Sequence, residues 1–451
     1  MTIDHNARAV PQQQTSRGAA LAFCVGFYFA ARVIATVFLV RIAGMEPQAG
    51  AVATLVSTSL LLGFVGLSVM GAARGETDSA FHLAEVRWVL LFLGFSGCSL
   101  LWSETISPIV SAAYWCGTAA DVAIVILLLR SYLAPGTAES LMRGFVWGAG
   151  FVAVISWVMP SQYDMRLGDE DYLNANTIGN LCAFGVFFAQ YLMRAKSGRW
   201  SFAIFFLALT LVRSLSKTAI VAFLIGEGYL LVQDRIMSRR TKMYVMIGVT
   251  VVVIAFWSLF EGYYDLYTTY GNQSETLTGR TAIWAYVVDA ASSRLWLGHG
   301  FDSMWKVVPV FGTFEARHAE NEVLEQLYCY GMAGLVLLCG LYGSLYRKIR
   351  KRSGDAHRVI FIGLLLFVIV RGLAEAEPFD LLLPLWAIVL VTSLTGRRDA
   401  VTQPALGETP LSDLRGGGFE TIPGAGSPAI VIPLSFVGST ASLRTPLGEN
   451  R

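Results

Sequence analysis

Residues 200–233, "WSFAIFFLALTLVRSLSKTAIVAFLIGEGYLLVQ", are almost continuously apolar, and basic clusters flank both ends. A helix needs about 20 apolar residues to cross a hydrocarbon core of roughly 30 Å. The stretch is too long for one such helix and short for two. Because Lys and Arg gather on the cytoplasmic side of a membrane, basic residues at both ends require two crossings. We therefore expect short helices at 200–214 and 216–233, with a turn near Ser214–Ser216.

The whole chain has the composition of a polytopic membrane protein. Hydrophobic residues make up 55% of it and charged residues 15%, and the mean hydropathy is +0.56, which is too apolar for a soluble globular protein. The apolar runs have the length of helices rather than of barrel strands. We predict an all-α integral membrane protein with twelve transmembrane helices, at 19–43, 49–72, 85–102, 108–130, 141–160, 175–193, 200–214, 216–233, 243–260, 323–346, 358–374 and 381–396.

Three basic clusters decide the orientation, because short cytoplasmic loops retain Lys and Arg. With twelve crossings the clusters fall on one side together with both termini. We expect a cytoplasmic N-terminus at 1–18, helices one to nine at 19–260, a long external loop at 261–322, helices ten to twelve at 323–396, and a disordered cytoplasmic tail at 397–451. No cleavable signal peptide is expected. The clusters are Arg194, Lys196 and Arg199; Arg235, Arg239, Arg240 and Lys242; and Arg347, Lys348, Arg350, Lys351 and Arg352.

Other features of the composition point to no special chemistry. All six cysteines lie in apolar runs without paired spacing, which indicates neither a disulfide framework nor a metal cluster. The net charge of +2 is uninformative, and we expect no nucleic-acid partner. One external loop is acidic. Its acids are typical of a solvated loop, with a divalent-ion site as the alternative, and they are Asp164, Asp169, Glu170 and Asp171.

Two cations flank the expected turn at Ser214–Ser216. Arg213 and Lys217 lie at the level of the outer headgroups, where charged groups are costly and commonly face a cavity or a partner. A single cation there is typical of snorkelling, in which a long side chain reaches the interface. Two cations around one tight turn favour the binding of an anion.

The long external loop adds a third cation in "TLTGRTAIWAYVVDAASSRLWLGHGFDSMW". Gly279 permits a close approach, and Arg280 leads an amphipathic helix whose N-terminal N–H groups favour a phosphate. The alternative is an ordinary surface arginine. The later "LGHGFDSMW" is typical of a Gly-rich turn. The apolar face of the helix is expected to carry Ile283, Trp284 and Val287.

A candidate base follows in "ARHAENEVLEQLYCYGMAGL". His318 and Glu320 precede a helix that Asn321 is expected to cap, and Gly331 and Gly334 permit close helix contact. His318 is a general-base candidate because its reference pKa is near 6.5. The alternative is a merely solvated loop histidine.

Charges inside other expected helices have two interpretations. Arg32, Asp121 and Glu227 lie near mid-span, where they either pair between helices or line the pathway of a transporter. A transporter concentrates charge at the midplane, whereas most of the unusual cations here lie near one face. At the outer end of the eleventh helix, Arg371 and Glu375 are candidates for the rim of a site, although such a pair is also typical of structural roles.

Six motifs together resemble the O-antigen ligase and Wzy-type polysaccharide polymerase family. The resemblance covers about residues 90–345 and rests on the order of the motifs and on their side of the membrane. It implies a glycosyltransferase C-like helical fold, and Lys217 and Arg280 match basic residues of the family. The motifs are "WSETISPIVS", "NANTIGN", "SLSKTA", "TGRTAIW", "LWLGHGFDSMW" and "NEVLEQLYCYGMAGL".

One departure from the family pattern concerns the base. Gap-free matching puts Glu320 where the family has a histidine, and His318 lies two residues earlier. Either side chain could accept the acceptor's proton, and His318 and Glu320 are both catalytic candidates. We favour His318, with a role shared between the two as the alternative. Arg213, Lys217 and Arg280 are expected to bind the substrate diphosphate, and the expected rim residues are Arg371, Glu375 and Asn321.

The resemblance implies a membrane glycosyltransferase without metal or cofactor. Such an enzyme transfers a glycan from undecaprenyl diphosphate to an acceptor hydroxyl on the periplasmic face of the bacterial inner membrane, with inversion. We expect polymerisation of exopolysaccharide or O-antigen repeat units. The alternatives are ligation to lipid A-core and, from another class, a flippase of lipid-linked glycans. Expected partners are the lipid-linked oligosaccharide, an acceptor glycan or glycolipid, and a chain-length regulator protein.

Overall fold

The computed structural model describes most of the predicted membrane region. The described residues are 9–45, 47–72, 83–131, 134–159, 165–169, 173–195, 198–234, 238–255, 257, 261, 277–304, 318–351 and 356–396. Every regular element among them is helical, which confirms the all-α prediction. The predicted disordered tail, 397–451, and much of the long loop, at 262–276 and 305–317, lie outside the described residues.

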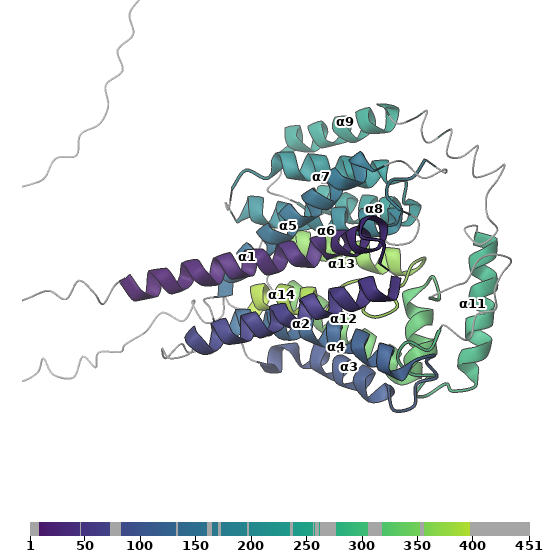
Figure 1. The fold of residues 1–451 in the computed structure, drawn as a ribbon. Coiled ribbons are helices and arrows are strands. Elements are labelled where there is room, and N and C mark those ends of the chain that lie inside the picture. The colour runs from purple at the N-terminus through teal and green to yellow at the C-terminus, as the bar shows by residue number, and fades with distance from the viewer. Residues whose placement is uncertain are drawn as a thin grey trace, which may run out of the picture. The chain divides into compact units, whose positions relative to one another are not determined.

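The helices of the first half pack as neighbouring rods, with α1 against α5 and α2 against α4 (Figure 1). Their bounds are α1 (Ala9–Val37, continued by a π-helical turn at Phe38–Ile42), α2 (Pro47–Ala72), α3 (Arg87–Ser99, preceded by a 3₁₀ turn at Leu83–Val86), α4 (Pro108–Ser131), α5 (Ala134–Val158) and α6 (Ala175–Arg194).

The second half adds α7 against α6, and α13 against α8, while α11 runs across the direction of the other helices and contacts α12 (Figure 1). The bounds are α7 (Ser201–Arg213), α8 (Lys217–Gln233), α9 (Arg239–Ala255), α11 (Leu277–Ser292), α12 (Glu322–Lys351), α13 (Ala356–Gly372) and α14 (Leu385–Gly396).

A helix overlaps each of the twelve ranges expected to cross the membrane. Length and composition qualify five segments as candidate membrane spans, so the chain is a multi-pass membrane protein. Twelve crossings remain a prediction. The five are Arg17–Ile42, Val52–Val69, Pro108–Ser131, Gly136–Val158 and Glu322–Lys351, and three shorter apolar helices are Arg87–Ser99, Ser201–Arg213 and Leu385–Thr395.

The turn predicted inside residues 200–233 is confirmed. Helix α7 ends at Arg213 and α8 begins at Lys217. Between them Leu215 takes a left-handed conformation, with φ of 59°, which reverses the chain within three residues. This turn places Ser216 at the N-cap of α8.

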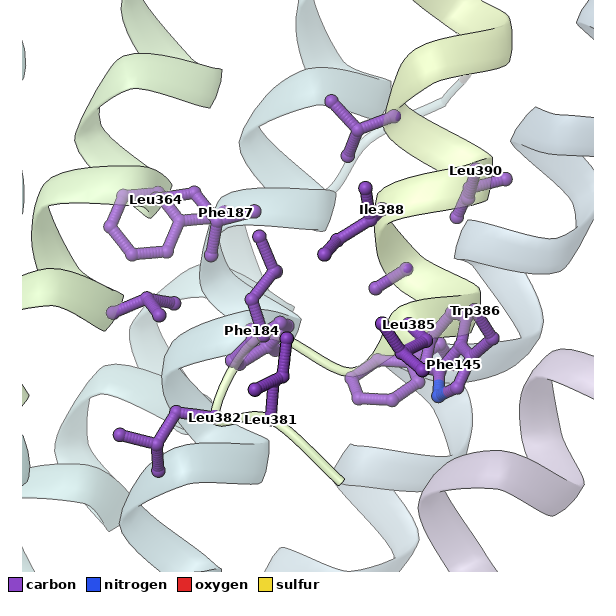
Figure 2. Packing of buried hydrophobic residues seen from close by; sticks show 14 of the residues in the cluster. Phe145, Phe184, Phe187, Leu364, Leu381, Leu382, Leu385, Trp386, Ile388 and Leu390 are labelled. Atoms are coloured by element: carbon purple, nitrogen blue, oxygen red, sulfur yellow. The ribbon is translucent and has the colours of Figure 1, made fainter. Parts of the chain in front are cut away.

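Aromatic side chains of α5, α6, α13 and α14 form a buried core (Figure 2). The ring centroids of Phe145 and Trp386 lie 5.7 Å apart. Those of Phe184 and Phe187 lie 6.1 and 6.0 Å from the ring centroid of Phe367. Such pairs add to the free energy gained by burying their area. The core fixes α6, α13 and α14, whose ends carry the candidate site.

Glycines let α1 and α5 approach at backbone distance. A Cβ built on Gly26 would lie 1.9 Å from the carbonyl oxygen of Leu141, and one on Gly144 would lie 1.9 Å from that of Phe23. Close packing through small residues is how membrane helices associate in the absence of a hydrophobic driving force.

The mid-span charges pair between helices, as the first of the two interpretations predicted. Arg32 Nη1 of α1 lies 2.6 Å from Asp121 Oδ2 of α4. Gln190 Nε2 of α6 donates to Glu227 Oε1 of α8 at 2.8 Å. The six cysteines all lie among the described residues, and each is free, as expected.

Candidate functional site

Three helices begin at one place, and each begins with a polar cap. Asn174 caps α6, Ser216 caps α8 and Asn321 caps α12. In each helix the backbone N–H three residues further on donates to the cap side chain, at 2.8, 3.4 and 3.1 Å respectively. The predicted cap Asn321 is therefore confirmed. Helix N-termini carry partial positive charge and favour anions.

Side-chain hydrogen bonds join these helix starts to the segment between α13 and α14. Ser216 Oγ donates to Asn176 Oδ1 at 2.7 Å, and Asn176 Nδ2 donates to Glu375 Oε2 at 2.7 Å. Asn321 Nδ2 donates to the carbonyl oxygen of Leu373 at 3.0 Å. The motifs "NANTIGN", "SLSKTA" and "NEVLEQ" thus meet at the end of α13.

Four of the residues singled out from the sequence form one cluster, which we call the His318 cluster: Arg280, His318, Glu320 and Glu375. His318 Nε2 lies 3.8 Å from Glu320 Oε1 and 4.0 Å from Glu375 Oε1. Arg280 Nη2 lies 3.1 Å from Glu320 Oε2, and Arg280 Nη1 donates to the carbonyl oxygen of Ala374 at 2.8 Å. Residues from the long loop, the start of α12 and the end of α13 therefore share one network.

A backbone hydrogen bond assigns the tautomer of His318. The N–H of Glu320 donates to His318 Nδ1 at 3.3 Å, so the ring proton is on Nε2, facing the two carboxylates. Burial favours the neutral imidazole, but the charges of Glu320 and Glu375 outweigh it and raise the pKa of His318. Burial and the neighbouring Glu320 carboxylate likewise raise the pKa of Glu375. The cluster is suited to holding and passing on a proton.

Two buried glutamates of the first turns of α12 brace the backbone around the cluster. Glu325 Oε2 accepts from the N–H of Ala319 at 2.7 Å. Glu322 Oε1 accepts from the N–H of Leu382 at 2.9 Å and from the hydroxyl of Tyr342 at 3.0 Å. Sequence reasoning missed both residues and also Asn176, although acids in the first turn of a helix are a readable signal.

The other two predicted diphosphate ligands lie on either side of the α7–α8 turn. Arg213 Nη1 donates to the carbonyl oxygen of Met165 at 2.8 Å, so its guanidinium binds the 165–169 segment. Lys217, the first residue of α8, has an exposed side chain directly after the cap Ser216. The turn therefore brings Lys217 next to the Ser216–Asn176 contact and directs Arg213 to a different segment.

Two of the three residues expected at the rim of the site are buried. Arg371 and Glu375 are buried, with 2% and 5% of their surface exposed, and Asn321 links α12 to the end of α13. Of the acidic run, Asp169 Oδ2 forms an ion pair with Arg41 Nε at 2.9 Å. Asp164, Glu170 and Asp171 lie outside the described residues.

A helix, α11, is present where one led by Arg280 was predicted, but it begins earlier, at Leu277, so Gly279 and Arg280 lie within its first turn. Its residues Ile283 and Val287 are 1% and 0% exposed, and the helix packs on α12. This burial holds Arg280 beside the start of α12.

The sequence predicted a Gly-rich turn in "LGHGFDSMW", and in the structure residues 298–304 pack against a kink in α12. The N–H groups of His299 and Gly300 donate to the carbonyl oxygens of Tyr328 and Cys329, at 2.9 and 2.7 Å. The helix kinks two residues later at Gly331, with φ of 63°. A Cβ on Gly331 would lie 2.5 Å from the backbone of Trp296, so the glycine serves loop contact here rather than helix contact.

A second polar cluster lies in this region, formed by Glu104, Arg294 and His299. His299 Nδ1 lies 3.1 Å from Glu104 Oε2, and Arg294 Nη2 lies 2.7 Å from Glu104 Oε1. His299 Nε2 lies 3.2 Å from the carbonyl oxygen of Ala290, and its ring stacks on Tyr328 at 4.4 Å. The motifs "WSETISPIVS" and "LWLGHGFDSMW" are joined by these contacts.

The His318 cluster also has ligand types suited to a cation. His318, Glu320 and Glu375 each offer one ligand atom, and these atoms lie within 4.8 Å of one another. However, Arg280 already contacts Glu320 and Asn176 already contacts Glu375, so both carboxylates have protein partners.

Comparisons with known proteins agree with this arrangement of motifs. Residues 202–339 match the family model described as O-antigen ligase. The chain is similar to the exopolysaccharide production protein ExoQ of Rhizobium meliloti (strain 1021), with 25% identity over 331 residues that cover 66% of this chain and 73% of the relative. The matched region includes the α7–α8 turn, Arg280, His318 and the kink of α12. The family match, the relative and the ordered motifs agree that this membrane protein is similar to the O-antigen ligase and Wzy-type family.

Proposed function

We propose that this protein is an inner-membrane glycosyltransferase that transfers a glycan from undecaprenyl diphosphate to an acceptor sugar hydroxyl on the periplasmic face, polymerising exopolysaccharide or O-antigen repeat units. The observation that carries the proposal is the convergence of the N-termini of α6, α8 and α12 on the His318 cluster. Three helix N-termini and Arg280 supply positive potential where the reaction produces negative charge.

The reaction breaks the bond between the anomeric carbon and a phosphate oxygen, and the electron pair leaves with the lipid diphosphate. Arg280 stabilises this leaving group, and Lys217 adds charge from the start of α8. The acceptor oxygen forms the new bond from the opposite face of the anomeric carbon, so the configuration inverts. No metal takes part in the proposed step.

The acceptor hydroxyl proton passes to the His318 cluster. Nε2 of His318 carries a proton in the resting state, so the carboxylates of Glu320 and Glu375 accept the proton of the acceptor hydroxyl first. His318 lies 3.8 and 4.0 Å from these two carboxylates and stabilises their negative charge. The proton then leaves with the diphosphate or to water, which resets the cluster. Glu320 thus acts as the proton acceptor at the position where the family pattern has a histidine, and His318 lies beside it.

The transporter alternative gains little support from the charges inside the helices. Arg32 with Asp121, and Glu227 with Gln190, are paired between helices. Ligation to a lipid A-core remains the second candidate because the matching family model is described as O-antigen ligase.

Purified protein in nanodiscs tests the proposal. Given only polyprenyl-diphosphate oligosaccharide, a polymerase produces a ladder of longer glycans and releases free polyprenyl diphosphate in equal amounts. A ligase produces neither until a lipid A-core acceptor is added. Absence of any polyprenyl diphosphate release with either acceptor would contradict both.

The orientation has its own test. A reporter fused near Asn272 is expected outside and one near Gly354 inside, because the basic clusters hold the second position in the cytoplasm. Finding both reporters on one side of the membrane would contradict a periplasmic site.

A further inference from the structure

Arg371, the last residue but one of α13, carries a buried guanidinium, and two of its three nitrogens have no hydrogen-bond partner among the residues that the structure describes. Only 2% of the residue is exposed. Its Nε and Nη1 are buried and donate no hydrogen bond, and across the described residues no carboxylate oxygen lies within 4.0 Å of the guanidinium. Burying a charged group in this way is costly unless something pairs with it.

Three carboxylates lie close enough to Arg371 to feel its charge: Glu322, Glu375 and Glu377. Two of them are held by other donors. Glu322 accepts from Tyr342 and from the backbone of Leu382, and Glu375 accepts from Asn176. These contacts keep the acids in place without closing an ion pair on Arg371. The Arg–Glu pair considered from the sequence is therefore not formed among the described residues.

Arg371 belongs to the same site as Arg280. The N–H of Ala374 donates to the carbonyl oxygen of Arg371 at 3.0 Å, and the carbonyl oxygen of Ala374 accepts from Arg280 at 2.8 Å. The charges of Arg371, His318 and Arg280 all act on Glu375. The two arginines thus flank one turn of backbone.

Among the described residues, the buried atoms without a hydrogen bond at this turn are three guanidinium nitrogens and one acceptor, Glu320 Oε2, which lies 3.1 Å from Arg280 Nη2. The three nitrogens are Arg280 Nε, Arg371 Nε and Arg371 Nη1, and each is buried and donates no hydrogen bond to a described residue. Arginine N–H groups match the oxygens of phosphate and carboxylate, and two of them on one guanidinium bind bidentately. A ligand that fills this site should supply anionic oxygens.

We propose that Arg371 binds a phosphate oxygen of a diphosphate, so that Arg280 and Arg371 hold the two phosphates from either side of the Ala374 turn. This inference rests on the proposed function, which supplies a lipid-linked diphosphate as the ligand. Free inorganic diphosphate has the same chemistry and is a simpler probe of the site.

Binding of inorganic pyrophosphate to the full chain in nanodiscs, measured by calorimetry, tests Arg371 without relying on transfer. Arg371→Gln should weaken binding about tenfold or more, because a charge-assisted contact is lost, and Arg371→Lys should recover part of it. Arg358→Gln, at the opposite end of α13, is the matched control and should bind as the wild type does. Wild-type affinity in Arg371→Gln would overturn the proposal.

A labelling measurement covers the case in which Arg371→Gln does not fold. Phenylglyoxal modification of Arg371 in the wild-type protein, read by mass spectrometry, should fall about fivefold or more when pyrophosphate saturates the site. Equal protection by polyprenyl diphosphate identifies the lipid headgroup as a ligand, whereas protection by pyrophosphate alone restricts the site to the free anion. Unchanged labelling of Arg371 with both ligands would overturn the proposal.

The two proposals fail in different ways. Pyrophosphate binding that depends on Arg371, in a protein that transfers no glycan, would retain the anion site and refute the glycosyltransferase. Glycan transfer by a protein whose Arg371→Gln variant binds both diphosphates normally would refute the role of Arg371 alone.

Discussion

Two polar clusters adjoin α12, and they differ in how completely their groups are paired. In the cluster of Glu104, Arg294 and His299, both carboxylate oxygens and both ring nitrogens have a partner. Beside the His318 cluster, the guanidiniums of Arg280 and Arg371 have buried nitrogens for which the described part of the chain supplies no acceptor. Paired polar groups fix a structure, whereas unpaired buried donors are retained at a cost in stability. From this difference we infer that the first cluster holds the fold, and we propose that the second binds a ligand.

Replacing arginine by lysine should produce the largest difference in turnover between the two clusters. Arg280→Lys keeps the charge but loses the planar fork, so we expect a loss of about 3 kcal/mol of transition-state stabilisation, or roughly a hundredfold in turnover. Lys217→Arg should cost less, since a point contact accepts either cation. The measurement is transfer from polyprenyl-diphosphate oligosaccharide by purified variants.

Arg294→Lys is the matched control for this exchange. Its partner Glu104 is about as exposed as Arg294 itself, and exposed ion pairs contribute little. Turnover within about twofold of the wild type is expected. An equal loss in Arg280→Lys and Arg294→Lys would remove the distinction between the two clusters.

A substitution in the cluster of Glu104, Arg294 and His299 should lower the stability of the protein rather than its turnover. His299→Phe keeps a ring to stack on Tyr328 but removes the ring nitrogens that contact Glu104 Oε2 and the carbonyl oxygen of Ala290. We expect a loss of about 1–3 kcal/mol in the free energy of unfolding, with turnover per folded molecule nearly unchanged. Thermal denaturation in detergent, compared with turnover of the folded fraction, checks this. A large loss of turnover without a loss of stability would place His299 in the chemistry.

The smallest expected effect is on the dependence of rate on pH. Since the base must release its proton before it can act, turnover should rise with pH through the pKa of the His318 cluster. Glu320 and Glu375 raise the pKa of His318, so the midpoint should lie above the ordinary value of about 6.5.

Glu375→Gln sharpens this prediction because it removes one of the four carboxylates that raise the pKa of His318. The midpoint of the pH–rate profile should move to lower pH, and His299→Phe should leave it in place. A midpoint that stays unchanged in Glu375→Gln would show that Glu375 takes no part in the proton transfer.

Local sequence signals predicted much of the fold. Apolar runs located the helices, and the polar residues Ser216 and Asn321 marked two helix starts. The turn inside residues 200–233 followed from span length and flanking charge. Each of these features depends on neighbours along the chain, which is why the sequence alone could reveal them.

Contacts between distant residues were not predictable in the same way. Asn176 and Glu375 are 199 residues apart, and no local pattern pairs them. The burial of Arg371 depends on how α13 packs, and the left-handed Gly331 became clear only with the loop that lies against it. The sequence thus supplied most candidate residues of the site but not their partners.

The central claim is that the His318 cluster accepts the proton of the acceptor during transfer from a lipid diphosphate. Its most direct test is a purified double variant, His318→Ala with Glu320→Ala, given polyprenyl-diphosphate oligosaccharide while donor binding and transfer are both measured. Binding close to wild type, with transfer lowered by about a hundredfold to ten-thousandfold, is the predicted result. Transfer at the wild-type rate in this double variant would contradict the account.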